Sequence, residues 1–265
     1  MARAHRHYLP GMIWHLTHRC HERKFLLKFA CDRQAWIGWL FEARQRFGLS
    51  VLDYMVTSNH IHLLVHDRKG HEVIPESMQL VAGRTAEEYN RRKQRHGAFW
   101  KDSYHATAIE SGPHFRQCLA YLDLNMVRAG AVMHPEQWPD CGYVEIQHPK
   151  ACYRIIDYEQ LMELVGVSRQ EHLQQACREQ AEAAIEQKQL RRQGHWSDSI
   201  AVDSSAYVEA LKKQLGPRAK GRDILAVEGA NQLRETEAAY QGIFEGEKGR
   251  LRLENRRFWN LSFKH

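Results

Sequence analysis

The pattern of apolar and polar positions divides the first 130 residues into short strands and longer helices. Runs with a period of two, or short continuous apolar runs that follow Gly and Pro, are typical of strands. Apolar residues spaced three and four apart are typical of helices with one buried face. The pattern predicts strands at 11–18, 49–56, 60–66 and 104–110, and helices at 32–47, about 76–95 and about 114–130.

This order is β-α-β-β-α-β followed by a helix, which is the split βαβ arrangement of ferredoxin-like domains. We therefore expect an α+β fold in which an antiparallel sheet carries helices on one face. The two strands joined by Thr57–Asn59 are expected to form an antiparallel hairpin. A ferredoxin-like sheet hosts many functions, so the fold class alone names none.

The character of the chain changes after Pro149. Residues 157–192 have a helical pattern rich in Glu, Gln and Ala, Ser204 can cap a short helix that ends at Leu215, and a further helix is expected over 222–240. We therefore expect two parts: a domain at 1–149 and a mostly helical C-terminal extension at 150–265.

Charge and histidine content are uneven along the chain. The formal net charge is +6 and the sequence pI is about 9.0. Residues 1–150 carry 20 Lys and Arg against 15 Asp and Glu, a net of +5, whereas 151–265 carry 18 against 17, a net of +1. Residues 1–150 also hold 14 of the 17 histidines. This balance favours an anionic partner, with the chemistry in the first part.

Six cysteines show no Cys-x-x-Cys pair and no regular spacing, which is typical of reduced thiols in a cytosolic protein. No apolar run approaches the roughly 18 residues of a membrane span. The start of the chain, Met1 to His7, is basic but has no apolar signal core behind it. We expect a cytoplasmic protein without a membrane partner.

The run from Thr57 to Val65 places two imidazoles two residues apart in an apolar strand. His60 and His62 then point to the same face, where they form half of a divalent metal site or are simply satisfied polar groups. The metallo-hydrolase pattern His-x-His-x-Asp-His fails, because Leu64 and Val65 stand at its last two positions. No cysteine pair has zinc-finger spacing.

Tyr121 and Asn125 lie four apart in a helical pattern and therefore share a face. A lone tyrosine on such a helix usually packs in a core, but the polar residue one turn later favours a site. An amide oxygen beside two histidines suits Mg²⁺ or Mn²⁺ at a phosphate. Together these residues suggest a cation held by His60, His62 and Asn125, with Tyr121 as a nucleophile that forms a 5′-phosphotyrosine.

Four motifs, in order and spacing over residues 1 to about 145, resemble the IS200-like single-tyrosine transposases and most of all their REP-associated branch. The resemblance implies a ferredoxin-like HUH nuclease in which His60 and His62 bind the cation and Tyr121 attacks single-stranded DNA carrying REP-type hairpins. Asn125 stands where insertion-sequence members have Gln. The motifs are Tyr8-Leu9-Pro10-Gly11, Ser58-Asn59-His60-Ile61-His62-Leu63-Leu64, Phe99-Trp100-Lys101 and Tyr121-Leu122-Asp123-Leu124-Asn125-Met126-Val127-Arg128-Ala129-Gly130.

Basic and aromatic residues outside these motifs are candidates for DNA binding, with a solvated helix face or a docked terminal segment as the competing interpretation. Trp196 and the basic, aromatic tail are expected either to grip a hairpin or to cover the active site, and the extension is expected to bind hairpins or to regulate. The candidates are Arg3, Arg6, Arg91, Arg92, Arg95, Trp196, Arg256 and Arg257.

Three other functions compete with a nuclease that cuts and rejoins DNA. A replication-initiator HUH nuclease shares the order of the motifs but often places a Lys near the tyrosine. A hairpin-binding protein without cleavage activity is the alternative from another class, and a sequence-specific repressor is weaker because no helix-turn-helix stands out. The sequence leaves monomer and homodimer open.

Overall fold

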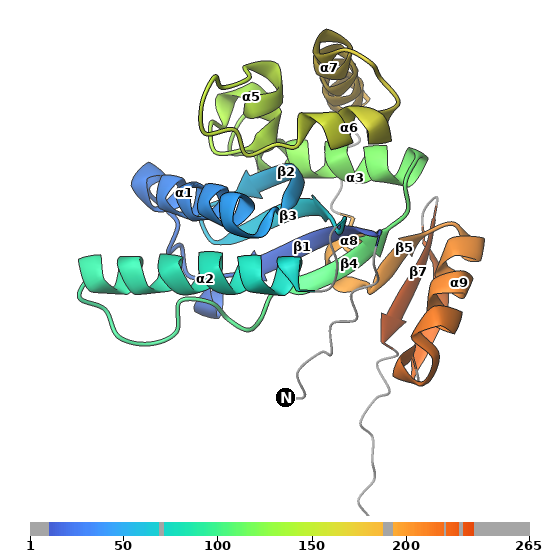
Figure 1. Ribbon diagram of the computed structural model, residues 1–265, viewed down its shortest axis with the longest axis horizontal. Coiled ribbons are helices and arrows are strands. Elements are labelled where there is room, and N and C mark those ends of the chain that lie inside the picture. The colour runs from blue at the N-terminus through green and yellow to red at the C-terminus, as the bar shows by residue number, and fades with distance from the viewer. Residues whose placement is uncertain (1–10, 69–71, 188–192, 220, 228–229, 236–265) are drawn as a thin grey trace, which may run out of the picture. The chain divides into compact units, whose positions relative to one another are not determined.

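The computed structural model describes residues 11–68, 72–187, 193–219, 221–227 and 230–235 (Figure 1). Within them one mixed sheet has the strand order β2-β3-β1-β4-β5-β7-β6. The strands are β1 Ile13–Arg19, β2 Ser50–Val56, β3 His60–His66, β4 His105–Ile109, β5 Ala201–Asp203, β6 Arg222–Val227 and β7 Ala230–Glu235. The helices are α1 Ala30–Phe47, α2 Val73–Arg92, α3 Pro113–Asp123, α4 Asn125–Arg128, α5 Gly142–Gln147, α6 Tyr158–Val165, α7 Gln170–Glu186, α8 His195–Asp198 and α9 Ser205–Leu215.

The first four strands and two helices confirm the expected split βαβ core. β1 lies between β3 and β4 and is antiparallel to both, and β2 and β3 form the expected hairpin. Gly48 ends α1 in the left-handed conformation, at φ 71°, which a residue without Cβ adopts at little cost. The expected N-cap Asp32 lies instead inside α1, buried and paired with Arg92 of α2, and Phe29 takes the cap position.

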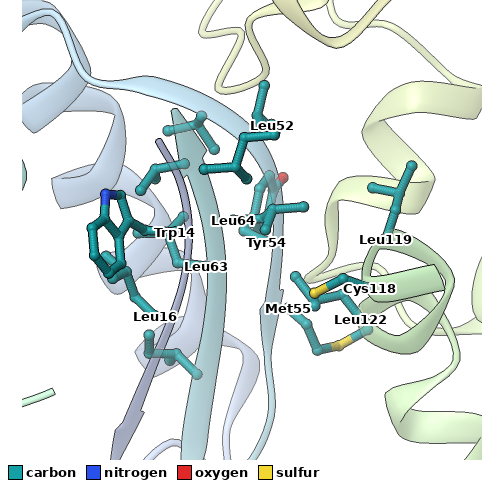
Figure 2. Packing of buried hydrophobic residues seen from close by; sticks show 14 of the residues in the cluster. Trp14, Leu16, Leu52, Tyr54, Met55, Leu63, Leu64, Cys118, Leu119 and Leu122 are labelled. Carbon is teal, nitrogen blue, oxygen red and sulfur yellow. The ribbon is translucent and has the colours of Figure 1, made fainter. Parts of the chain in front are cut away.

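The two faces of the core sheet are packed against different helices. α1 and α2 pack against each other on one face, where Trp14 and Leu16 of β1 are buried (Figures 1 and 2). α3 covers the opposite face, where Cys118 and Leu122 lie against Met55 of β2 (Figure 2). The helices expected on one face are therefore α1 and α2, and the helix of Tyr121 closes the other face.

The C-terminal extension continues the same sheet. β5 pairs in parallel with β4, and β7 is antiparallel to β5. α7 packs on α3 and α5, and Ser204 caps α9 as expected, its hydroxyl accepting from the Tyr207 N–H. The domain boundary expected between residues 149 and 150 stays a prediction. Strands from both sides of it belong to one sheet.

The prediction of a helix over 222–240 is wrong for those residues of the range that the structure describes. Arg222–Val227 and Ala230–Glu235 form the antiparallel hairpin β6–β7. Leu233 of β7 is buried opposite Ala201 of β5, so pairing with the existing sheet overrides a weak helical pattern. Residues 236–240 lie outside the described residues.

Two further expectations concern the whole chain. All six cysteines are free thiols. Among the described helices, none is both long enough and apolar enough to span a membrane.

Candidate metal and tyrosine site

The candidate site lies on the sheet face that α3 covers. His60 and His62 both point to this face from β3, because they are two residues apart on a strand. Their imidazole rings meet edge to face with centroids 4.9 Å apart. Thr17 of β1 is the register partner of His62, so His15 on the same strand shares this face. The structure thus brings together the expected histidine pair and a third imidazole.

The tight connection before β3 orients His60. Nδ1 of His60 lies 2.7 Å from Oδ1 of Asn59 and 2.9 Å from Oγ1 of Thr57. The amide nitrogen of Asn59 donates to the carbonyl of Arg23 at 3.2 Å, which places its oxygen toward His60. An amide oxygen only accepts, so Nδ1 of His60 carries a proton, and in the neutral ring Nε2 is then the atom with a lone pair.

A chain of three hydrogen bonds orients His62. Nδ1 of His15 lies 2.8 Å from the main-chain carbonyl of Trp196, and Nε2 of His15 lies 2.8 Å from Nδ1 of His62. Burial lowers the pKa of His15 to about 3 and holds the pKa of His62 well below its ordinary value, so both rings are neutral. The carbonyl accepts from His15, whose Nε2 then accepts from His62, and this leaves Nε2 of His62 unprotonated.

Asn125 reaches His62. Its Nδ2 lies 3.1 Å from Nε2 of His62. The expected continuous helix is interrupted: α3 ends at Asp123, α4 begins at Asn125, and Leu124 between them has a ψ of 6°. The short amide is therefore brought to the histidine by a break in the helix, and rotating the amide by 180° would present its oxygen at the same place.

Tyr121 lies beside this group, largely buried at 7% exposure. Its ring centroid is 6.1 Å from that of His62 and 6.4 Å from that of His15. The guanidinium of Arg128 stacks over the Tyr121 ring at 3.9 Å and donates to its carbonyl at 2.6 Å. The Tyr121 ring thus lies close to the two histidine rings and to the positively charged guanidinium of Arg128.

The donor set fits a divalent cation. Nδ2 of Asn125 and Nε2 of His62 are 3.1 Å apart, which is a hydrogen-bond distance. It is also close to the roughly 3 Å between neighbouring ligands of an octahedral cation with bonds of about 2.1 Å. His62 keeps Nε2 unprotonated, as does a neutral His60, and an unprotonated ring nitrogen is what a metal ligand needs. Within the described part of the chain, His, Cys, Asp and Glu side chains alone form no cluster of three or more suited to a metal.

The candidate DNA-binding residues have different surroundings. Arg91 is exposed near the end of α2. Arg92 is ion-paired with Asp32, and Arg95 donates to the carbonyl of Ala98 at 2.8 Å, so both guanidinium groups also have structural partners. Trp196 is 1% exposed and tilted against Tyr121, with ring centroids 6.4 Å apart. Its indole therefore covers the tyrosine rather than facing solvent. Arg3, Arg6, Arg256 and Arg257 lie outside the described residues.

Sequence reasoning missed two side chains of the site. Arg128 was part of the tyrosine motif, and its basic charge seven residues after Tyr121 was the available signal. His15 carries no such signal, because its place beside His62 depends on the pairing of β1 with β3.

One family model matches the part of the chain that holds the sequence motifs. The family described as "Transposase IS200 like" matches residues 9–124, which include His60, His62 and Tyr121. One similar solved structure is that of the REP-associated tyrosine transposase bound to a REP hairpin, at 16% identity and a TM-score of 0.47, covering 59% of this chain and 94% of that chain. Another is a proposed transposase from Deinococcus radiodurans R1, at 18% identity and a TM-score of 0.33, covering 49% and 98%. No curated relative matches the chain.

Proposed function

We propose that the chain, whose residues 9–124 match the IS200-like transposase family, is a metal-dependent, site-specific endonuclease and strand transferase for single-stranded DNA. The observation that carries the proposal is the gathering of Tyr121, His60, His62 and Asn125 on one sheet face. A transposase processes DNA, and a tyrosine beside a donor set for a cation supplies the groups needed to cut a phosphodiester.

His60 and His62 would hold the cation through Nε2, with Asn125 as a third ligand through its amide oxygen. Mg²⁺ and Mn²⁺ both suit this mixed nitrogen and oxygen set. When bound, the cation polarises the scissile phosphate and offsets the charge that develops on its oxygens. Asn59 and His15 keep the two imidazoles in the protonation state that the ligand role requires.

Tyr121 is the nucleophile in this account. Its hydroxyl oxygen attacks the phosphorus, a bond from the tyrosine oxygen to phosphorus forms, and the bond from phosphorus to the 3′-oxygen breaks. The phenol loses its proton and the departing 3′-oxygen gains one, so the step balances. The DNA 5′-phosphate stays on Tyr121, and attack by a second 3′-hydroxyl reverses the step and rejoins the strand.

Arg128 would support the nucleophile directly. Its guanidinium lies over the Tyr121 ring at 3.9 Å and donates to the Tyr121 carbonyl. This pair of contacts fixes the ring and places a positive charge where the anionic phosphate must approach.

The substrate we propose is single-stranded DNA with REP-type hairpins, on the strength of the resemblance of the four motifs to the REP-associated branch. A tyrosine nuclease needs an unpaired backbone within reach, and a hairpin foot supplies one. Arg91, exposed on α2, is a candidate to bind phosphate, and Arg3, Arg6, Arg256 and Arg257 remain candidates outside the described residues.

A strand-labelled cleavage assay tests the proposal. The protein is incubated with 5′- or 3′-labelled REP-like hairpins in Mg²⁺, Mn²⁺ or EDTA, and the products are separated on a denaturing gel. We expect metal-dependent cleavage in which the fragment downstream of the cut stays attached to protein. Hairpin binding without cleavage under every metal condition would favour the alternative, a hairpin-binding protein. Attachment of the fragment upstream of the cut would exclude the 5′-phosphotyrosine.

A further inference from the structure

We propose that His15 is a positioning residue for the metal site and that the C-terminal extension, through the main-chain carbonyl of Trp196, is the group that fixes it. The inference rests on the proposed role of His62 as a cation ligand. It adds that a segment beyond the family match at 9–124 completes the site, so the extension is part of the nuclease centre rather than an appended module.

The direction of each hydrogen bond carries the argument. A carbonyl can only accept, so Nδ1 of His15 donates to Trp196 across 2.8 Å. Nε2 of neutral His15 can then only accept, and the proton in its 2.8 Å contact with His62 belongs to Nδ1 of His62. The proton is thereby kept off Nε2 of His62, the atom that faces Asn125 and would bind the cation.

Burial makes this arrangement specific. His15 is fully buried and His62 is 3% exposed, so bulk water does not offer either ring an alternative partner. The two rings also stack, with centroids 5.0 Å apart and planes 16° apart. A single hydrogen-bonded arrangement therefore sets both the protonation and the orientation of the ligand.

The extension is fastened to the same sheet face by further bonds. The carbonyl of Ser199 lies 2.8 Å from Nε2 of His105 and accepts from the Thr107 hydroxyl at 2.6 Å, both on β4. The indole of Trp196 is buried against Tyr121, and its Nε1 donates to the Gln193 side chain at 2.8 Å. These contacts hold the Trp196 carbonyl at a fixed place above His15.

Two substitutions at His15 separate hydrogen bonding from packing. In His15→Phe a buried ring remains, but it can neither donate to Trp196 nor accept from His62. In His15→Gln the amide can donate through its nitrogen and accept through its oxygen, so it can restore both bonds. His105→Phe is the matched control, because it also removes a bond from a sheet histidine to an extension carbonyl but has no bond to His62.

The readouts do not depend on DNA cleavage. Long-range ¹H–¹⁵N spectra of the full-length protein labelled on histidine report which nitrogen of His62 is protonated, and calorimetric titration with Mn²⁺ alone reports metal affinity. We expect the Nδ1–H form of His62 in the wild type, in His15→Gln and in His105→Phe. In His15→Phe we expect the Nε2–H form to appear and Mn²⁺ affinity to fall roughly 10- to 100-fold.

Several results would overturn the inference. An Nε2–H form of His62 in the wild type does so whether or not any variant folds. A folded His15→Phe with the wild-type tautomer of His62 and the wild-type Mn²⁺ affinity would also overturn it. So would a loss of Mn²⁺ affinity in His15→Gln as large as that in His15→Phe. If the wild type binds no Mn²⁺, the proposal of a metal-dependent function is wrong. The claim that His15 positions a metal ligand is then wrong as well. The tautomer spectra then still decide whether His15 sets the protonation of His62.

Discussion

The imidazole of His15 donates to the main-chain carbonyl of Trp196 across 2.8 Å, although 181 residues separate them in the chain. One residue lies on β1 of the ferredoxin-like core and the other on α8 of the extension. His15 in turn contacts His62, the candidate ligand on β3. The extension and the core therefore meet at the candidate site itself, and several consequences can be measured.

The extension is expected to be required for a stable core. Glu145 of α5, 2% exposed, accepts from the main-chain N–H groups of Ile155 and Ile156 at 2.7 and 2.9 Å, and removal of residues 150–265 would leave this carboxylate without those donors. Ile156, Leu173 and Val202 are also buried, and each contributes about 1.5–3 kcal/mol.

We predict that residues 1–149 alone show no cooperative thermal transition by circular dichroism. A chain that ends at residue 235 keeps all of these contacts and serves as the control. A fragment 1–149 that melts as cooperatively as the control would show that the extension is a separate module.

Gly142 is predicted to be intolerant of a side chain. A Cβ at this position would overlap Oδ1 of Asp53 and come within 3.0 Å of the Tyr54 main-chain nitrogen. We expect Gly142→Ala to reduce the free energy of unfolding by about 1–3 kcal/mol in urea titrations. Gly38→Ala is the matched control: this site in α1 is exposed with nothing within 4 Å of a new Cβ, so we expect a gain of up to about 1 kcal/mol. Equal effects of the two substitutions would contradict the packing described here.

Asp123 is predicted to make stability depend on pH. Burial raises its pKa to about 8, and burial together with the charge of Asp123 raises the pKa of neighbouring Asp53 well above its usual range. Between an unfolded pKa of about 3.9 and the folded value, the unfolded chain binds fewer protons than the folded one. The contribution of Asp123 to stability is therefore fully present below about pH 4 and is lost as pH rises toward 8.

Asp123→Asn removes this proton and should flatten the dependence. The slope attributable to the residue reaches at most about 1.4 kcal/mol per pH unit. We expect Asp123→Asn to be clearly more stable relative to the wild type, with a relatively larger free energy of unfolding, at pH 8 than at pH 5. If the difference in the free energy of unfolding between variant and wild type is the same at both pH values, Asp123 is not the group that makes stability depend on pH.

Arg128 is predicted to accelerate cleavage. Its guanidinium both stacks on Tyr121 and bonds the Tyr121 carbonyl, and a hydrogen bond from a charged group contributes about 1.5–3 kcal/mol. If these contacts position the nucleophile, Arg128→Ala should slow single-turnover cleavage of a REP-like hairpin roughly 10- to 100-fold, while Arg128→Lys retains part of the rate. Cleavage by Arg128→Ala at the wild-type rate would show that Arg128 does not support the nucleophile.

Local patterns were sufficient for the core of the fold. Period-two and helical spacing located β1 to β4, α1 and α2 to within a few residues, because each of these elements buries one face. The pair His60 and His62 followed from the same alternation, since residues two apart on a strand share a face. Asp32 was misread as a helix cap because its buried partner, Arg92, lies 60 residues away.

Local sequence patterns could not predict contacts between segments that are distant in the chain. The hairpin β6–β7 exists because β7 finds a partner in β5, which itself pairs with β4. His15 gains its role only when β1 pairs with β3 and α8 reaches the same face. The sequence left open whether Trp196 would grip DNA or cover the site, because its burial against Tyr121 is encoded by no local pattern.

The central claim is that Tyr121 becomes covalently attached to DNA. Intact-mass spectrometry of the protein, after incubation with a single-stranded REP-like hairpin and Mn²⁺, measures this directly. We expect a mass increase equal to the fragment downstream of the cut, absent in EDTA and in Tyr121→Phe, while Tyr121→Phe still binds the hairpin with nearly wild-type affinity. A covalent adduct of the same mass in Tyr121→Phe would contradict the assignment of the nucleophile.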